Sequence, residues 1–478
     1  MSPLPTRRVR SSAGRDPGHP LALAQDIPEG RLADREDATV TPLQSTARVP
    51  LNALDYFLLV GERLSQRHGL PGVTPGLLHV NFRGRLDMSQ LQDAADRLVT
   101  RWPLITARLV RSPYPAWVPT GAQRWHIRQQ TLDSDSEADL LRAVYELGVQ
   151  PFDLENEDPV RLIVLHRPGG DDMLTMKASH ILLDLHGGVC LLQQLLDSTR
   201  IPPVGGTVMP PTDVLAQALA NTPFRVRMKA VRRMMRQSRQ VTPVTLPLLV
   251  TKRPAHLILG RVTRRWIDET ASAKLQERLE NIGPFANLSL AILASGCRTL
   301  SRYVPGPLGP RSGYVIMLPY NLRRGPLKRF PFHNLATRLE LVARPTDLAD
   351  RDELTRLFAS QLRAQIADKT TIAPLQLVTA FRGLDRWAPW LSGRFRPGPR
   401  SLHASSVGEI VKSGRAILGA TVDYCWINTL FMPFAGVSLN LIKAGRRHLA
   451  VFMHSPYNLA DEQAPKFLDE WLEDLCRP

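Results

Sequence analysis

The sequence is poor in cysteine, and this scarcity excludes the classes of protein that depend on it. Only four cysteines occur among 478 residues, and no two of them have the Cys-x-x-Cys spacing of zinc or redox sites. A disulfide framework or a structural zinc site is therefore not expected, and we predict a reduced, intracellular protein without a metal. The four are Cys190, Cys297, Cys425 and Cys476.

Segments that would direct the chain into or across a membrane are also missing. No continuous apolar core precedes Asp26, so the arginine-rich N-terminus does not have the pattern of a secretory signal. The uncharged run 424–442 contains asparagine, proline and glycine, which favour two buried strands and a turn over a spanning helix. We therefore expect a cytoplasmic protein whose membrane contact, if there is any, is peripheral.

Acidic residues are absent from two long stretches, 214–267 and 281–339, which hold twelve and eight basic residues. The chain as a whole carries a net charge of +17, so it should attract anionic partners. Within the first stretch, 224–239 places apolar side chains on one helical face among seven basic residues. This pattern is typical of a solvated connector, of a helix on an anionic membrane surface, or of a dock for an acidic carrier protein or the phosphates of CoA. No aromatic-interleaved or zinc module supports nucleic-acid binding.

The remaining composition indicates a globular protein. Hydrophobic residues make up 43% of the chain, enough to bury a large core. Residues 1–49 are polar and lack apolar periodicity, so we predict a disordered tail. Strand and helix patterns alternate over the rest, which predicts a mixed α/β (α+β) fold. Its two similar lobes, 50–240 and 241–478, should each contain a mixed sheet with helices.

Hydrophobic periodicity and end signals predict the individual elements. Asp87 can cap a helix whose apolar residues follow at helical spacing, and that helix should end before Pro103. A strand at 160–165 should return at 173–178 through a turn at 167–171. The other predicted helices are 137–148, 188–196, 269–281, 286–302, 350–367 and 462–475, and the other predicted strands are 77–82, 104–110, 314–318, 336–343, 437–442 and 448–453.

The segment after this strand pair contains the chemistry-bearing motif. It reads S-H-I-L-L-D-L-H-G-G over 179–188, with His180 four residues before Asp184. Such a pair is a weak signal alone, but here it lies between a strand and a glycine-opened apolar helix. Catalytic groups are often held in loops of this kind, where rigid elements position them and substrates still reach them. No G-x-S-x-G motif accompanies it, which disfavours a serine hydrolase.

Further landmarks surround this motif, and their order resembles a known superfamily. They are L-D-Y-F at 54–57, L-D to P-L over 86–104, P-F-D-L at 151–154, a helix at 286–302, M-L-P-Y-N-L-R at 317–323 and H-N at 333–334. The resemblance that they carry covers about residues 50–475. The chain is similar to the chloramphenicol-acetyltransferase-like superfamily. Its members include peptide-synthetase condensation domains, BAHD acyltransferases and wax-ester synthase/diacylglycerol acyltransferases.

The resemblance implies an acyltransferase whose two lobes meet at a channel. His180 would be the general base that activates a hydroxyl or amine to attack an acyl thioester. Asp184 would be structural, paired with Arg323. The resemblance implies no tightly bound cofactor, because acyl-CoA or a phosphopantetheine thioester is the co-substrate. The other candidate channel or oxyanion contacts are Ser179, His186, Gly187, Gly188 and Asn334.

The chain departs from the superfamily pattern at two positions of the motif and lacks one signature. Ser179 replaces the first histidine of H-H-x-x-x-D-G, and Leu185 replaces its glycine. A leucine would strain the loop if the backbone needs φ > 0 there. The BAHD signature D-F-G-W-G has no counterpart near 426–437. An alternative function is therefore a catalytically degenerate relative that binds a lipid or a carrier protein. A free-standing condensation protein that uses carrier-bound substrates is a variant of the first hypothesis.

Overall fold

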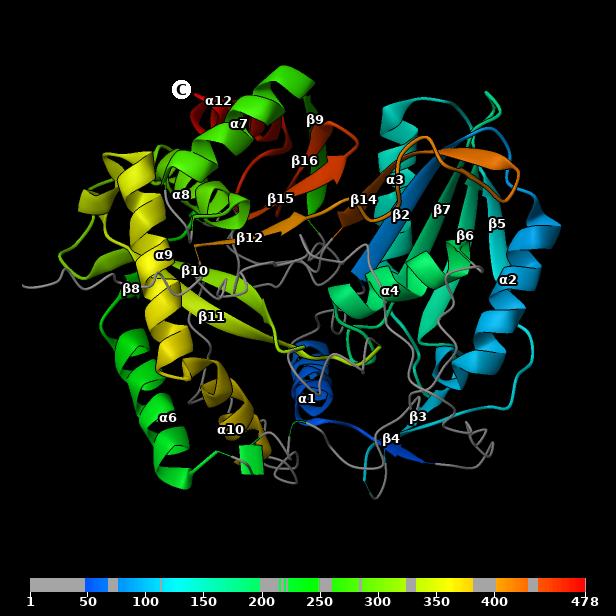
Figure 1. Ribbon diagram of the computed structural model, residues 1–478, viewed down its shortest axis with the longest axis horizontal. Coiled ribbons are helices and arrows are strands. Elements are labelled where there is room, and N and C mark those ends of the chain that lie inside the picture. The colour runs from blue at the N-terminus through cyan, green and yellow to red at the C-terminus, as the bar shows by residue number, and fades with distance from the viewer. Residues whose placement is uncertain are drawn as a thin grey trace, which may run out of the picture.

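The computed structural model of the protein contains two large sheets that lie side by side, each with its own helices (Figure 1). It describes residues 48–67, 76–111, 114–197, 215, 219–220, 222–247, 249, 260–282, 286–323, 332–380, 401–428 and 437–477. The predicted tail, 1–49, lies outside these residues except at its end. There, Val49–Pro50 form strand β1.

The first lobe is built on a six-stranded sheet in the order β13-β14-β2-β7-β6-β5. Neighbouring strands are antiparallel, except that β5 runs parallel to β6. A small sheet of β1, β4 and β3 lies beside it. The bounds are β2 Gly76–Arg83, β3 Arg108–Val110, β4 Ala116–Val118, β5 Ile127–Thr131, β6 Val160–His166, β7 Asp172–Ala178, β13 Ala416–Ile417 and β14 Ala420–Asn428.

The helices of the first lobe are α1 (Ala53–Arg67), α2 (Met88–Arg101), α3 (Glu137–Val149) and α4 (Leu185–Leu196). The predicted helix after Asp87 is confirmed in detail. The Asp87 carboxylate accepts hydrogen bonds from the first turn of α2, and the apolar residues at helical spacing face the core. They are Leu91, Ala94, Ala95, Leu98 and Val99.

The second lobe is built on a seven-stranded mixed sheet in the order β11-β10-β12-β15-β16-β9, with β8 on β10. The strands are β8 Thr242–Pro243, β9 Arg261–Ile267, β10 Ser312–Asn321, β11 Ala336–Ala343, β12 Leu402–Val407, β15 Val437–Ala444 and β16 Arg447–His454. The helices are α6 Phe224–Arg239, α7 Glu269–Ile282, α8 Leu288–Ser301, α9 Arg351–Ala367, α10 Ala373–Ala380 and α12 Ala464–Cys476.

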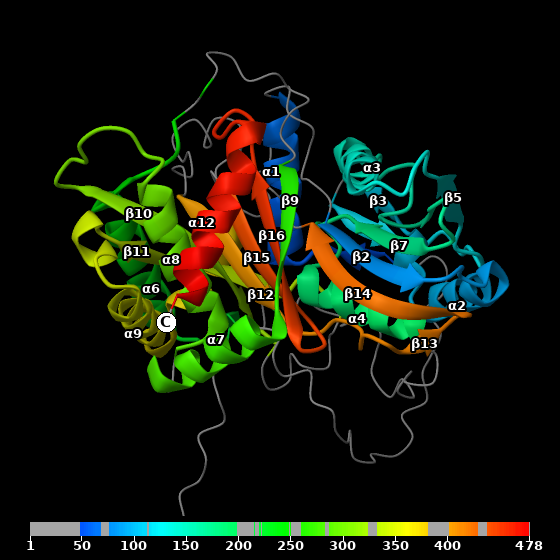
Figure 2. The same cartoon turned by 90° about the horizontal axis from the view of Figure 1, so that it is seen from above.

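Sheet membership does not follow the predicted division at residue 240. Strands β13 and β14 come from the C-terminal half of the chain, yet β14 pairs with β2 over its length. Figure 2 shows β14 in the first lobe, while β15 and β16 lie in the second. The uncharged run 424–442 thus supplies one strand to each lobe, with residues between them outside the description. The chain therefore passes from the second lobe back to the first before β13 and returns to the second after β14.

Two predicted elements differ in the structure. Residues 104–110 were expected to be one strand, but Pro103–Thr106 form a 3₁₀ turn and only Arg108–Val110 are extended. Proline fixes φ and starts such a turn readily, and a short apolar run gives no periodicity to oppose it. The helix expected from residue 188 begins at Leu185, because Asp184 caps it.

Candidate active site

The His180 motif lies in the loop between β7 and α4, at the junction of the two lobes. The loop is a tight turn that its own backbone holds. The Ser179 amide donates to the Pro159 carbonyl at 2.8 Å, and the amides of Leu182 and Leu183 donate back to the Ser179 carbonyl. Ser179 is buried, so it belongs to the frame of the loop. His180 follows on the outside of this turn and is half-buried.

Asp184 ties the loop to the second lobe through a buried ion pair with Arg323. Arg323 Nη1 lies 2.7 Å from Asp184 Oδ2, and Nη2 lies 2.9 Å from Oδ1. The two side chains are 1% and 4% exposed, Asp184 first, so water does not screen them. The same carboxylate accepts from the amides of Gly187 and Leu335, each at 2.8 Å. Burial alone raises the pKa of Asp184, but Arg323 and the hydrogen bonds outweigh it and the pKa is lowered.

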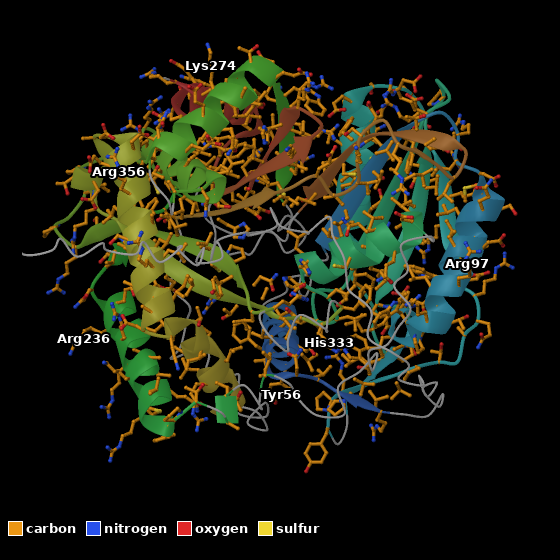
Figure 3. The ribbon with its side chains drawn as sticks, viewed as in Figure 1. Tyr56, Arg97, Arg236, Lys274, His333 and Arg356 are labelled. Carbon is orange, nitrogen blue, oxygen red and sulfur yellow. The ribbon has the colours of Figure 1, made fainter. Side chains whose placement is uncertain are left out.

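Asn334 supports the loop from the second lobe. Its side-chain amide donates to the His180 carbonyl at 2.9 Å, and its own carbonyl accepts from Asn52. The sequence left open whether Asn334 contacts an acceptor molecule or the loop backbone. The geometry assigns its amide group to the backbone of His180. Figure 3 shows the neighbouring His333 between the lobes.

The electrostatic surroundings keep the His180 imidazole neutral. Burial lowers its pKa, and this outweighs Asp184 and the carbonyls of His180 and Leu183, which raise it. Nδ1 is buried, which leaves Nε2 as the nitrogen that a substrate can reach. A neutral imidazole with one accessible nitrogen can accept a proton at neutral pH.

The first turn of α4 contains three of the other predicted contacts. The Gly187 amide donates to the Asp184 carboxylate, which caps the helix. This amide is therefore engaged within the loop and does not face an oxyanion. A Cβ on Gly188 would lie 2.8 Å from a methyl carbon of Leu78, so this glycine permits close packing of α4 on β2. His186 Nε2 lies 3.5 Å from Cys190 Sγ, and burial lowers the pKa of His186.

The beginning of α4 also contains Leu185 and Cys190, whose roles the structure clarifies. Leu185 is the first residue of α4 and is not among the residues with positive φ. Its substitution for the motif glycine therefore causes no backbone strain, contrary to the concern from sequence. Burial raises the pKa of the Cys190 thiol to about 11, so it stays protonated and suits packing better than nucleophilic attack. All four cysteines are free thiols.

Sequence reasoning missed His403, a buried histidine of the second lobe. It lies on β12 in the second lobe, and its Nδ1 is 3.1 Å from Ser438 Oγ. Burial, together with a smaller contribution from His180, lowers the pKa of His403 to about 4. Its strand reads L-H-A-S-S-V, which is too short and polar for periodicity to mark it as buried.

The basic segment 224–239 forms helix α6, away from the site. Ala230 and Val231 pack against Ala373, so α6 is a packed element and not a solvated linker. Its outer face carries four exposed cations that form no ion pair with a described carboxylate: Arg225, Lys229, Arg232 and Arg236. Arg236 points outward in Figure 3. A groove of 1580 Å³ between α6 and α9 is lined by these cations, with the exposed Phe224 at one end.

The described part of the chain contains neither a candidate metal site nor a candidate membrane span. No cluster of three or more histidine, cysteine, aspartate or glutamate side chains there could hold a metal ion. No helix in the same ranges has the length and apolar character to cross a bilayer.

Comparison with known proteins identifies the fold. No family model and no curated protein sequence matches the chain. Among solved structures, the first condensation domain of the CDA synthetase superposes with a TM-score of 0.69 at 15% identity, covering 91% of this chain and 98% of that one. The EpoB cyclization-docking bidomain from Sorangium cellulosum gives 0.65 at 14% identity, covering 92% and 87%.

A third similar structure, polyketide synthase associated protein 5 from Mycobacterium tuberculosis, gives a TM-score of 0.59 at 17% identity, covering 90% of this chain and 98% of that one. These similarities extend over nearly the whole of each chain. The protein therefore has a condensation-domain fold, with two lobes and mixed sheets. The resemblance inferred from the order of sequence landmarks is confirmed at the level of fold.

Proposed function

We propose that the protein is an acyltransferase that moves an acyl group from a thioester to a hydroxyl or amine, with His180 as general base. The donor is the thioester of CoA or of a phosphopantetheine arm on a carrier protein. It is consumed as a co-substrate, so the reaction needs no tightly bound cofactor. The observation that carries the proposal is a neutral, partly accessible imidazole fixed at the lobe junction by the buried Asp184–Arg323 pair.

The proposed reaction needs one proton acceptor and no covalent enzyme intermediate. His180 Nε2 takes the proton of the acceptor's O–H or N–H group as its oxygen or nitrogen attacks the thioester carbonyl carbon. The resulting tetrahedral intermediate collapses when the C–S bond breaks. The thiolate leaves with the bond electrons and receives the proton from His180. The products are an ester or amide and a free thiol, and His180 is again neutral.

The surrounding contacts suit this role because they fix the loop and leave the His180 imidazole free of these hydrogen bonds. Asp184 is fully engaged with Arg323 and two backbone amides, so it supports the loop and does not serve as a second base. Asn334 adds a bond to the His180 carbonyl. Pre-positioning of this kind lowers the entropic cost of bringing base and acceptor together.

The test is thiol release by the purified full-length protein. It would be given short- to long-chain acyl-CoAs and, separately, acylated carrier proteins, each with mixed alcohol and amine acceptors. We expect acceptor-dependent release of thiol that falls at least ~100-fold in His180→Ala. His126→Ala is the matched control, because His126 is an exposed histidine of the same lobe and should retain full activity.

The outcomes separate the two hypotheses. His180-dependent turnover excludes a silent binding module, and the donor that works distinguishes CoA from a carrier protein. If the folded protein binds acylated carrier protein or lipid without releasing thiol, the alternative function as a degenerate interaction module is supported instead. Undiminished turnover in His180→Ala would remove the proposed mechanism.

A further inference from the structure

Helix α6 carries two sets of cations with different surroundings. The anchoring set fixes the helix to its own lobe: Arg227 Nη1 lies 2.9 Å from Gln376 Oε1 on α10, and Arg233 forms an ion pair with Asp368. Buried apolar contacts between α6 and α10 add to this attachment. The other cations of α6 take no part in these contacts, so the packing of the helix does not explain them.

The outer set forms a straight row of four charges on α6. Its members follow one another at intervals of four, three and four residues, which places them on one face of the helix. At a rise of about 1.5 Å per residue, the row is about 16 Å long. All four are exposed and lack an ion pair with a described carboxylate: Arg225, Lys229, Arg232 and Arg236. Figure 1 shows α6 at the outer edge of the second lobe.

Apolar side chains border this row on one flank. Phe224, the first residue of α6, is 62% exposed. Met228 and Met235 follow it at helical spacing, are partly exposed, and line the groove between α6 and α9. No carboxylate is among the described residues that line this groove. The outer side of α6 thus combines continuous positive charge with apolar groups that a partner can reach.

This arrangement fits an anionic lipid bilayer better than a protein partner. A protein interface typically has an apolar centre that is depleted of charge, with polar residues at its rim. On α6 the order is reversed, because the charges occupy the centre of the outer face and the apolar groups lie at its margin. A bilayer offers the complementary chemistry, a layer of phosphate groups above an apolar interior. Basic clusters on an amphipathic helix are typical of such contacts.

We propose that the outer face of α6 binds an anionic membrane surface, with its four cations at the phosphate headgroups and Phe224 inserted beside them. Each basic residue near such a surface strengthens binding about fivefold, so the row of four supplies most of the attraction. The helix would lie in the plane of the surface and hold the second lobe against it. This contact involves no acyl transfer, so it stands apart from the proposed function.

The test is binding of the full-length protein to vesicles at physiological ionic strength. Vesicles of equal parts phosphatidylcholine and phosphatidylserine are compared with vesicles of phosphatidylcholine alone, and bound protein is measured by flotation. We expect wild type to bind the anionic vesicles only. A variant in which Arg225, Lys229, Arg232 and Arg236 are all changed to glutamine should bind them ~100- to 1000-fold more weakly.

Two further variants separate the contributions of position, charge and the aromatic ring. The matched control removes the same charge elsewhere, by changing to glutamine the exposed residues Arg83, Arg142, Arg356 and Arg446. It should lose less than ~10-fold, because salt screens charges that lie more than ~8 Å from the bilayer. Phe224→Ala keeps every charge and should lose ~10-fold, because the inserted ring is removed. Circular dichroism checks that each variant is folded.

Each outcome supports the proposal or overturns it. Equal losses in the two four-residue variants would overturn the assignment to α6, and equal binding to the neutral vesicles would overturn its electrostatic basis. Undiminished binding of Phe224→Ala would overturn the insertion of the ring. If wild type binds neither kind of vesicle but binds an acidic carrier protein through the α6 cations, the partner is a protein and the proposal is wrong. None of these measurements depends on turnover, so they are independent of the proposed function.

Discussion

Arginine is used in two contrasting ways in this molecule. Arg323 is buried at the lobe junction and pairs with one carboxylate in bidentate geometry. The cations on the outer face of α6 are exposed and pair with no described carboxylate. The first arrangement fixes two segments that are far apart in the sequence, since a buried charge is stable only in the right geometry. The second does little for the fold and leaves charge available for an anionic partner. Burial thus decides whether a charge determines structure or recognition.

Breaking the buried pair should have the largest effect. Asp184→Ala leaves the Arg323 guanidinium buried without its carboxylate and removes the cap of α4, so we expect a loss of about 3–5 kcal/mol in unfolding free energy. Urea unfolding monitored by circular dichroism measures it. Asp423→Ala is the matched control, because its pair with Arg83 is 3.6 Å long and exposed. A loss as small as the control's would contradict the structural role of the pair.

The buried histidines should make stability depend on pH. The pKa of His403 falls from 6.5 to about 4 on folding because of burial. Between these values the unfolded chain binds more protons than the folded one, so stability decreases as pH is lowered through this window. At 1.36 kcal/mol per pKa unit, His403 alone contributes a decrease of about 3 kcal/mol across it.

Chemical denaturation at several pH values between 7 and 4 checks this slope. His403→Leu should show a shallower decrease than wild type. A variant of the α6 cations should keep the wild-type slope, because it leaves the buried histidines unchanged. Equal slopes in wild type and His403→Leu would show that His403 is not buried in its neutral form.

Removing the exposed charges should have the smallest effect on stability and a clear effect on binding. Arg225, Lys229, Arg232 and Arg236 changed together to glutamine should alter unfolding free energy by less than about 1 kcal/mol. The same variant should leave heparin resin at lower salt than wild type, because fewer counterions are released on binding. A control variant replaces four other exposed arginines that have acidic partners: Arg83, Arg142, Arg356 and Arg446. Equal elution of the two variants would exclude α6 as a special anionic-partner surface.

The sequence predicted most elements whose signals are local. Helix α2 is predictable because its N-cap, Asp87, and its apolar residues at helical spacing lie within one segment. The His180 loop was found the same way, since the strand, turn and helix around it are contiguous. The pairing of Asp184 with Arg323 came from the resemblance, because nothing in the spacing of two residues 139 apart indicates contact. Residue order alone supported the fold, and the comparisons then confirmed it.

The parts that escaped prediction depend on distant neighbours. His403 is buried because β10 and β15, far from it in sequence, flank β12. Its own strand is too polar to predict that environment. The exchange of β14 into the first lobe is missed for the same reason, as its apolar pattern fits either sheet. The predicted start of α4, residue 188, lies three residues after the observed start at Leu185. Gly187 and Gly188 suggested a turn, whereas the Asp184 cap begins the helix before them.

The passage of β14 into the first lobe has a consequence for how the chain is made. During synthesis β2, at residues 76–83, emerges long before its partner β14, which consists of residues 420–428. At about 5–20 residues per second, the edge of β2 stays unpaired on the ribosome for many seconds. An open strand edge is a template for pairing with other nascent chains. The first lobe is thus begun before the second and completed only after much of the second has been made, so the newborn protein depends on protection of that edge until β14 has been made.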